Sequence, residues 1–217
     1  RSLVFERGKL VSDQTEASPA ENGTYIYFEP DNTLFKNYLF HGEFVETMLR
    51  NYTYLNSGLT IMYNGRRIKS RNGLEDLLVD AMTTDPLYPI VHIKGEDIEI
   101  AFTHCNQNGE EYYSFVNGQH TTLGGTHQAA FKKYIAEVIK EYSGKNYDYS
   151  DIRNGMVAAI SINIQEPLFE SPTKIKLGSL TTEPDGGSSI DNFIGEVVKS
   201  QVDNILHKNT AVAEIIM

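Results

Sequence analysis

Residues 151–179 read DIRNGMVAAISINIQEPLFESPTKIKLGS. The apolar run MVAAISINI (156–164) has the length and composition of a buried strand. The segment that follows, FESPTKIKLGS (169–179), places Lys174 and Lys176 between a proline and a glycine. A strand that ends in a stiff loop can hold a lysine at a fixed point, and phosphate oxygens are a common partner of such a charge. The alternative is a solvated surface loop, which spacing alone favours.

Four sequence blocks occur in a fixed order along the chain. They are NGTYIYFEPD (22–31), RNYTYLNSGLTI (50–61), GGTHQAAF (124–131) and the stretch 151–179. The last block contains an Asp-x-Arg-x-Gly run, a Pro-x-Phe-Glu turn and a Thr-Lys-x-Lys-Leu-Gly loop. Together these blocks resemble the B subunits of bacterial type II DNA topoisomerases, the family that includes the B subunits of DNA gyrase and topoisomerase IV.

The resemblance implies an α+β fold, in which an antiparallel or mixed sheet is backed by helices. Residues 1–72 would form the C-terminal part of a GHKL-type ATPase domain, the kind found in Hsp90. Residues 73–217 would form a transducer domain with the left-handed βαβ crossover shared with GHMP kinases. They would include the start of the helix that leads to the DNA cleavage core. We expect a fragment of a longer subunit, because the chain begins abruptly within strand-like sequence and the family's main ATP-binding motifs are not found.

The overall composition and charge of the chain exclude some classes of function. With 217 residues, 40% of them hydrophobic and 22% charged, the chain is ordinary globular material. The net charge of −10 argues against an autonomous DNA-binding domain, because non-specific affinity for DNA comes from neutralising phosphates. No run of eighteen apolar residues occurs, so we expect no membrane span. A single cysteine fits a reducing cytosol, and the resemblance implies a bacterial cytoplasmic location near the nucleoid. The single cysteine, Cys105, is expected to be structural.

Local patterns predict the secondary structure of the first part of the chain. The alternation in TYIYFE (24–29) predicts a strand. Apolar residues at helical spacing predict a helix over 42–56 with one buried face. Asn64 and Gly65 predict a two-residue hairpin turn, and a short amphipathic helix follows at 73–82.

The second part begins with three extended runs, 88–95, 97–105 and 111–118, which predict an antiparallel meander. Gly124 and Gly125 end the strands. Two long helices follow, and their starts are predicted from side chains that can cap a helix. These are Thr126 for the first helix, and Ser188 with Asp191 for the second.

The resemblance carries nucleotide contacts to two residues. Thr24 matches the family threonine that helps to hold adenine, although a threonine in a strand is ordinary. Lys174 matches the catalytic lysine that reaches the γ-phosphate of ATP and reports the nucleotide state. Pro172 stands where the family often has glutamine. The proline stiffens the loop and lacks the side-chain amide, and this difference hints at topoisomerase IV. His127 is interpreted as structural, because no acidic partner is evident nearby.

A basic segment, NGRRIKSR (64–71), is a candidate DNA-facing surface. Its cations are Arg66, Arg67, Lys69 and Arg71. A solvated hairpin tip is the alternative interpretation.

The resemblance implies a fragment that relays ATP binding and hydrolysis to DNA gate closure and strand passage in an ATP-dependent type II topoisomerase. The fragment alone is expected to be inactive. ATP and Mg²⁺ would serve the full-length subunit, with the Mg²⁺ ligands outside this chain and no metal site within it. The expected partners are the A-type subunit, a second B-type subunit and double-stranded DNA, but no membrane. The alternatives are a MutL- or Hsp90-like ATPase region and a non-catalytic interaction module.

Overall fold

The structure is a computed structural model that describes all of residues 1–217. The chain divides into two compact units, Arg1–Val45 and Glu46–Met217, and each is described by itself. The first unit holds one antiparallel hairpin, formed by β1 (Ser2–Glu6) and β2 (Lys9–Gln14).

The strand predicted at residues 24–29 is wrong. These residues form no strand, and the large side chains of Tyr25, Ile26 and Phe28 are exposed. The alternating pattern describes a segment suited to a sheet, but a strand exists only where a neighbour accepts and donates its backbone hydrogen bonds. Within the first unit, β1 and β2 pair only with each other.

Three predicted elements that precede the main sheet are confirmed. They are helix α1 (Gly42–Leu55), the hairpin of β3 (Thr60–Tyr63) and β4 (Arg66–Lys69), and helix α2 (Leu74–Ala81). The turn of the hairpin consists of Asn64 and Gly65, both with positive φ (48° and 77°), as a two-residue turn of this type requires.

The prediction that α1 buries its apolar face is wrong. Phe44, Met48 and Tyr52 on that face are exposed. The helix is anchored instead by its last turn, where Tyr54 is buried in a cluster with α2 and donates a hydrogen bond to Asp80. Helical periodicity reports that a face is apolar, but it does not report which element covers that face.

A five-stranded mixed sheet forms the centre of the second unit, in the order β5-β6-β9-β7-β8. Its strands are β5 (Val91–Gly95), β6 (Ile98–His104), β7 (Glu111–Val116), β8 (Gln119–His120) and β9 (Met156–Ile162). Strand β9 lies between β6 and β7, antiparallel to the first and parallel to the second.

The predicted meander is therefore wrong beyond its first hairpin, because β6 pairs with β9 and not with β7. Strand β9 is buried on both faces over almost its whole length, as a central strand must be. A run of extended segments in sequence shows which residues form strands, but it does not show that a later strand will enter between them.

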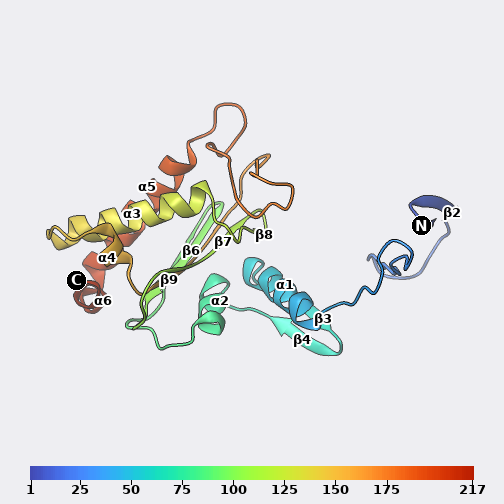
Figure 1. Ribbon diagram of the computed structural model, residues 1–217, viewed down its shortest axis with the longest axis horizontal. Helices are drawn as coiled ribbons and strands as arrows, with labels where there is room; N and C mark the ends of the chain where they lie inside the picture. The colour runs from blue at the N-terminus through green and yellow to red at the C-terminus, as the bar shows by residue number, and fades with distance from the viewer. The chain divides into compact units, whose positions relative to one another are not determined.

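Helices cover both faces of the sheet. The second unit contains α3 (Thr126–Ser143), α4 (Tyr149–Arg153), α5 (Ile190–Lys208) and α6 (Thr210–Ile216). Phe102 and Ile160 face α3 and α5, which lie side by side in Figure 1, while Ala101 and Ala159 face α2. None of the helices has the combination of length and hydrophobicity that a membrane-spanning helix needs.

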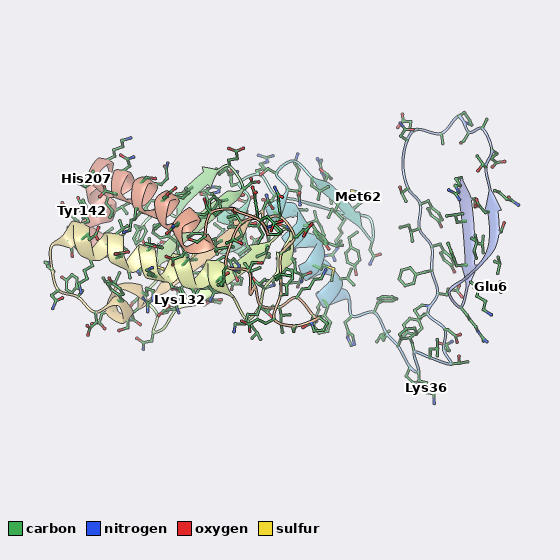
Figure 2. The ribbon with its side chains drawn as sticks, turned by 90° about the horizontal axis from the view of Figure 1, so that it is seen from above. Glu6, Lys36, Met62, Lys132, Tyr142 and His207 are labelled. Carbon is green, nitrogen blue, oxygen red and sulfur yellow. The ribbon has the colours of Figure 1, made fainter.

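The two long helices also meet where they end. Figure 2 labels Tyr142 of α3 and His207 of α5, whose rings form an edge-to-face contact with centroids 4.9 Å apart. The hydroxyl of Tyr142 donates to the carbonyl of Leu206 at 3.1 Å. Cys105, just after β6, is a buried free thiol, which agrees with its structural interpretation.

The predicted helix caps are wrong by one residue each. The capping position of α3 is Gly125, and Thr126 is the first helical residue. The cap of α5 is Ser189, whose hydroxyl accepts from the amide of Asn192 at 3.0 Å. Both errors come from placing a cap by residue type alone, where a glycine or a neighbouring serine can also occupy the position.

Candidate functional site

The loop that follows β9 contains the predicted lysines. Two of its segments pair through backbone hydrogen bonds, from Glu170 N to Lys176 O (3.0 Å) and from Gly178 N to Leu168 O (2.8 Å). The loop therefore has two legs, and its tip lies at residues 171–174. These backbone hydrogen bonds fix the two legs relative to each other at the base of the tip.

A tight turn closes the tip. The amide of Lys174 donates to the carbonyl of Ser171 at 3.0 Å, with Pro172 and Thr173 between them. Proline fixes its own φ and suits such a turn. Lys174 itself has φ +58°, a left-handed conformation that costs a residue other than glycine about 1 kcal/mol. Lys174, the candidate functional residue of the loop, is thus also the residue with the strained backbone.

The ammonium group of Lys174 is free. Its side chain is exposed, and it forms no hydrogen bond, ion pair or ring contact with the rest of the chain. Lys176, two residues later, differs because its Nζ lies 2.8 Å from Glu170 Oε2. Of the two predicted lysines, only Lys174 has a charge without a partner and so can meet an external anion.

The loop is attached to the start of α3. Leu123 N donates to Ile175 O (2.9 Å), Leu177 N to Gly124 O (3.0 Å) and Thr126 N to Leu177 O (3.2 Å). These bonds lay the second leg of the loop parallel to residues 123–126. The sequence offered one signal for this contact, the pair of glycines before the helix, because glycine permits close approach of two backbones.

His127 lies buried beneath this attachment, with no acidic side chain bonded to it. Its Nε2 is 3.1 Å from Thr121 Oγ1, and that hydroxyl donates its proton to Ser114 O. The same hydroxyl lies 2.7 Å from Ser114 Oγ, so Nε2 contacts a small buried network of hydroxyl groups. Nδ1 has no partner, and burial lowers the pKa of His127 to about 4. The imidazole is neutral, which agrees with its structural interpretation.

Thr24 lies in the first unit, whereas Lys174 lies in the second. The side chain of Thr24 is exposed, and Thr24 is not part of a strand. The adenine contact predicted for Thr24 stays a prediction.

Three of the four predicted DNA-facing cations lie on β4 of the β3–β4 hairpin, and the fourth, Arg71, follows it. Arg67 and Lys69 share one face of β4, because side chains alternate along a strand. Arg66 lies on the other face, where its Nη2 is 2.9 Å from Glu46 Oε2. Arg71 follows the strand and is exposed. The structure thus leaves three of the four cations without an ion pair, and their role with DNA stays a prediction.

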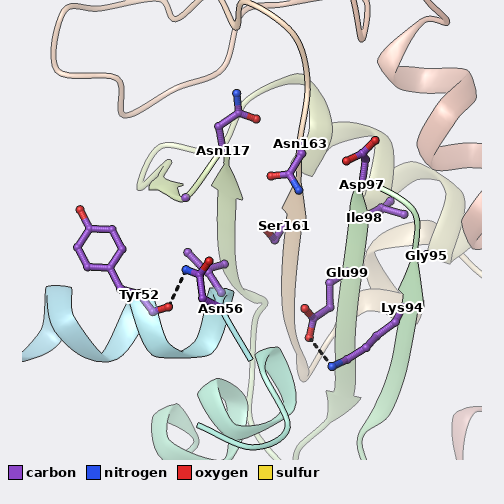
Figure 3. A pocket seen from close by; sticks show the side chains of 12 residues that line it. Tyr52, Asn56, Lys94, Gly95, Asp97, Ile98, Glu99, Asn117, Ser161 and Asn163 are labelled. Atoms are coloured by element: carbon purple, nitrogen blue, oxygen red, sulfur yellow. Dashed lines mark hydrogen bonds and ion pairs between the residues drawn. The ribbon is translucent and has the colours of Figure 1, made fainter. Parts of the chain in front are cut away.

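A cleft of about 540 Å³ opens between the last turn of α1 and one end of the sheet (Figure 3). Its charged residues include Lys94 and Glu99, whose Nζ and Oε1 are 3.9 Å apart. The carboxylate of Glu99 already has partners within the fold, because its Oε1 accepts a hydrogen bond from the amide of Leu74 at 3.0 Å and lies 2.8 Å from His92 Nε2. None of the predicted site residues lines this cleft. No group of three or more His, Cys, Asp or Glu side chains is placed to hold a metal ion.

The mixed α+β fold is similar to that of gyrase B structures. It is similar to the 43K ATPase domain of Thermus thermophilus gyrase B, solved in complex with an aminocoumarin, with a TM-score of 0.67 and 24% identity over 87% of this chain and 54% of that one. It is also similar to the B-subunit of the DNA gyrase from Myxococcus xanthus, with a TM-score of 0.74 and 16% identity over 99% of this chain and 66% of that one. These identities establish the fold alone.

Residues 45–217 match the family described as DNA gyrase B, and the chain belongs to this family. It is 39% identical over 206 residues to the DNA topoisomerase 4 B-type subunit of Borreliella burgdorferi, covering 94% of this chain and 34% of that protein. It is 30% identical over 235 residues to the DNA gyrase B-type subunit of Helicobacter pylori, covering 98% of this chain and 29% of that protein. The chain thus spans about a third of the length of these relatives. The family resemblance is confirmed, over the MutL- or Hsp90-like alternative.

Proposed function

We propose that the chain is the part of an ATP-dependent type II topoisomerase, in its B-type subunit, that relays ATP binding and hydrolysis to DNA gate closure and strand passage. The observation that carries this proposal is Lys174, an unpaired ammonium at the tip of a hydrogen-bonded loop. Membership of the DNA gyrase B family supports the setting of a B-type subunit.

The chemistry of the proposed contact follows from charge. ATP supplies a γ-phosphate whose negative charge is spread over its oxygens in the transition state of transfer. A compact ammonium held in place stabilises that charge without having to reorganise. Hydrolysis removes this partner, so the position of Lys174 depends on which nucleotide is bound. The free Nζ of Lys174 fits this use, and the Mg²⁺ ligands would lie elsewhere in the subunit.

The domain assignment belongs to the same proposal. Residues 1–72 would complete an ATPase domain of the GHKL type, with Thr24 at the adenine, and residues 73–217 would form the transducer. The connection from β7 through α3 to the adjacent parallel strand β9 is the unit that would have the left-handed crossover. Helix α5 would continue towards the cleavage core.

The proposed partners are a second B-type subunit, the A-type subunit and duplex DNA, in the bacterial cytoplasm at the nucleoid. DNA would meet Arg67, Lys69 and Arg71 of the basic hairpin, whose charges are exposed. Arg66 is a weaker candidate because it already pairs with Glu46. The alternative of a non-catalytic interaction module would gain support from a Lys174 buried in an ion pair, whereas this lysine is exposed and unpaired.

Lys174→Ala in the intact B-type subunit tests the proposal when it is assayed with the A-type subunit for ATP turnover and supercoil relaxation. We expect both activities to fall on the order of a hundredfold or more, because a preorganised charge at the transferring phosphate is lost. The matched control is Lys176→Ala, which removes a paired charge from the same loop and should retain turnover. Normal turnover in Lys174→Ala would overturn the proposal. The isolated chain should be inactive.

A further inference from the structure

We propose that Gly125 and Thr126 are positioning residues for Lys174. They would attach the lysine loop to the first turn of α3, so that the loop and the helix move as one body. The inference rests on the proposed function, in which Lys174 meets the γ-phosphate, and it names the residues that set the position of that charge.

The first contact is steric. Gly125 forms a parallel bridge with Leu177 and has φ +137°, a conformation that favours glycine. A Cβ at Gly125 would collide with the backbone oxygen and nitrogen of Leu177. Because the colliding atoms are backbone, no rotamer change can make room for a side chain. The loop approaches the helix this closely only while residue 125 is glycine.

The second contact is a hydrogen bond. The hydroxyl of Thr126 donates to the carbonyl of Ser179 at 2.7 Å. The hydroxyl of Ser179 in turn accepts from the amide of Leu168 at 2.8 Å, which belongs to the other leg of the loop. Thr126 is therefore connected to both legs of the loop through Ser179. Because Ser179 is buried, its hydrogen bond with Thr126 is shielded from water.

The attachment continues into the helix pair. Phe131 and Ile135 of α3 are fully buried in one cluster with Ile194 and Val198 of α5. Close-packed interiors resist deformation, so a shift at the start of α3 is passed to α5 as a rigid movement. Near the start of α5, the hydroxyl of Tyr134 donates to Asp191 Oδ2 at 2.6 Å. An anion that attracts Lys174 would thus move the lysine loop together with α3 and α5.

Gly125→Ala in the intact subunit tests the steric contact, with Gly124→Ala as its matched control. Both variants place alanine at a positive φ, but the atoms nearest to a Cβ at Gly124 belong to the flexible end of the Gln128 side chain and not to backbone. We expect Gly125→Ala to lower kcat about tenfold or more, with a smaller change in KM, because the charge is displaced from the reacting phosphate. The preference for a non-hydrolysable ATP analogue over ADP should fall, and amide exchange at Leu177 should quicken. Gly124→Ala should keep all three properties close to wild type.

Thr126→Val and Thr126→Ser provide a second test if Gly125→Ala does not fold. Valine keeps the shape without the hydroxyl and should lose the nucleotide preference, whereas serine keeps the hydroxyl and should restore it. A folded Gly125→Ala or Thr126→Val with wild-type kcat and nucleotide preference would overturn the inference. If Lys174→Ala impairs turnover while these variants do not, only the positioning role fails. If Lys174→Ala is also without effect, the proposed function fails with it.

Discussion

At the scale of single residues, the loop places a strained backbone angle and a free charge on the same residue. Lys174 is the one residue of the loop tip with a left-handed backbone, and its ammonium has no partner. Such strain persists only where the surrounding structure holds it, and here the two paired legs do so. We infer that the turn is shaped to present the lysine rather than to relax around it.

A residue-scale prediction concerns His127, which is fully buried and neutral. Burial lowers its pKa from 6.5 to about 4, so between these pH values the unfolded chain binds a proton that the folded chain does not. This contribution to stability is fully present above pH 6.5 and is lost as the pH falls towards 4, by about 3 kcal/mol in total.

Urea denaturation of the chain at pH 7 and pH 5 measures this effect. His127→Gln should show a smaller loss of unfolding free energy between the two pH values than wild type shows. His104, whose pKa burial also lowers, remains in both proteins, so their difference isolates His127. An equal loss in the two proteins would contradict the assignment.

The motif in the sequence made Lys174 a candidate site residue, which stays a prediction, and the lack of an acidic neighbour predicted that His127 is structural. The sequence could not predict the φ of Lys174 or the buried bond from His127 to Thr121, because a motif gives residue types and fixes neither backbone angles nor side-chain partners. Motifs report which side chains matter, and the backbone that presents them is a property of the fold.

At the scale of elements, the structure separates two neighbouring serines at the start of α5. Ser189 caps the helix through its hydroxyl, while Ser188 contributes its backbone carbonyl to the amide of Thr182. Ser189→Ala should therefore cost about 1 kcal/mol of unfolding free energy, and Ser188→Ala much less. Chemical denaturation of the two variants measures the difference. A larger loss in Ser188→Ala would contradict the cap that the structure shows.

Helices and hairpins were the predictable elements. Helical spacing predicted α2, and the Asn-Gly pair predicted the β3–β4 turn, since each depends on residues close in sequence. The place of β9 between β6 and β7 could not be predicted, because the pairing joins segments about 50 residues apart. The strand expected at residues 24–29 did not form, because no other segment pairs with these residues.

At the scale of the whole molecule, the lysine loop, α3 and α5 belong to one continuous structure in the second unit. The loop is bonded to the start of α3, and α3 packs along α5 over a buried face. In the proposed relay, an event at the tip of the loop would be transmitted over the length of these two helices. This arrangement suits a relay between a nucleotide and a distant part of the proposed subunit.

The most direct test of the central claim is the affinity of the intact subunit for a non-hydrolysable ATP analogue and for ADP, measured in wild type and in Lys174→Ala. If Lys174 meets the γ-phosphate, the variant should lose about tenfold or more of the preference for the analogue, as expected for one charge-assisted hydrogen bond. Affinity for ADP should hardly change, and Lys176→Ala should keep the preference. An unchanged preference in Lys174→Ala would contradict the account.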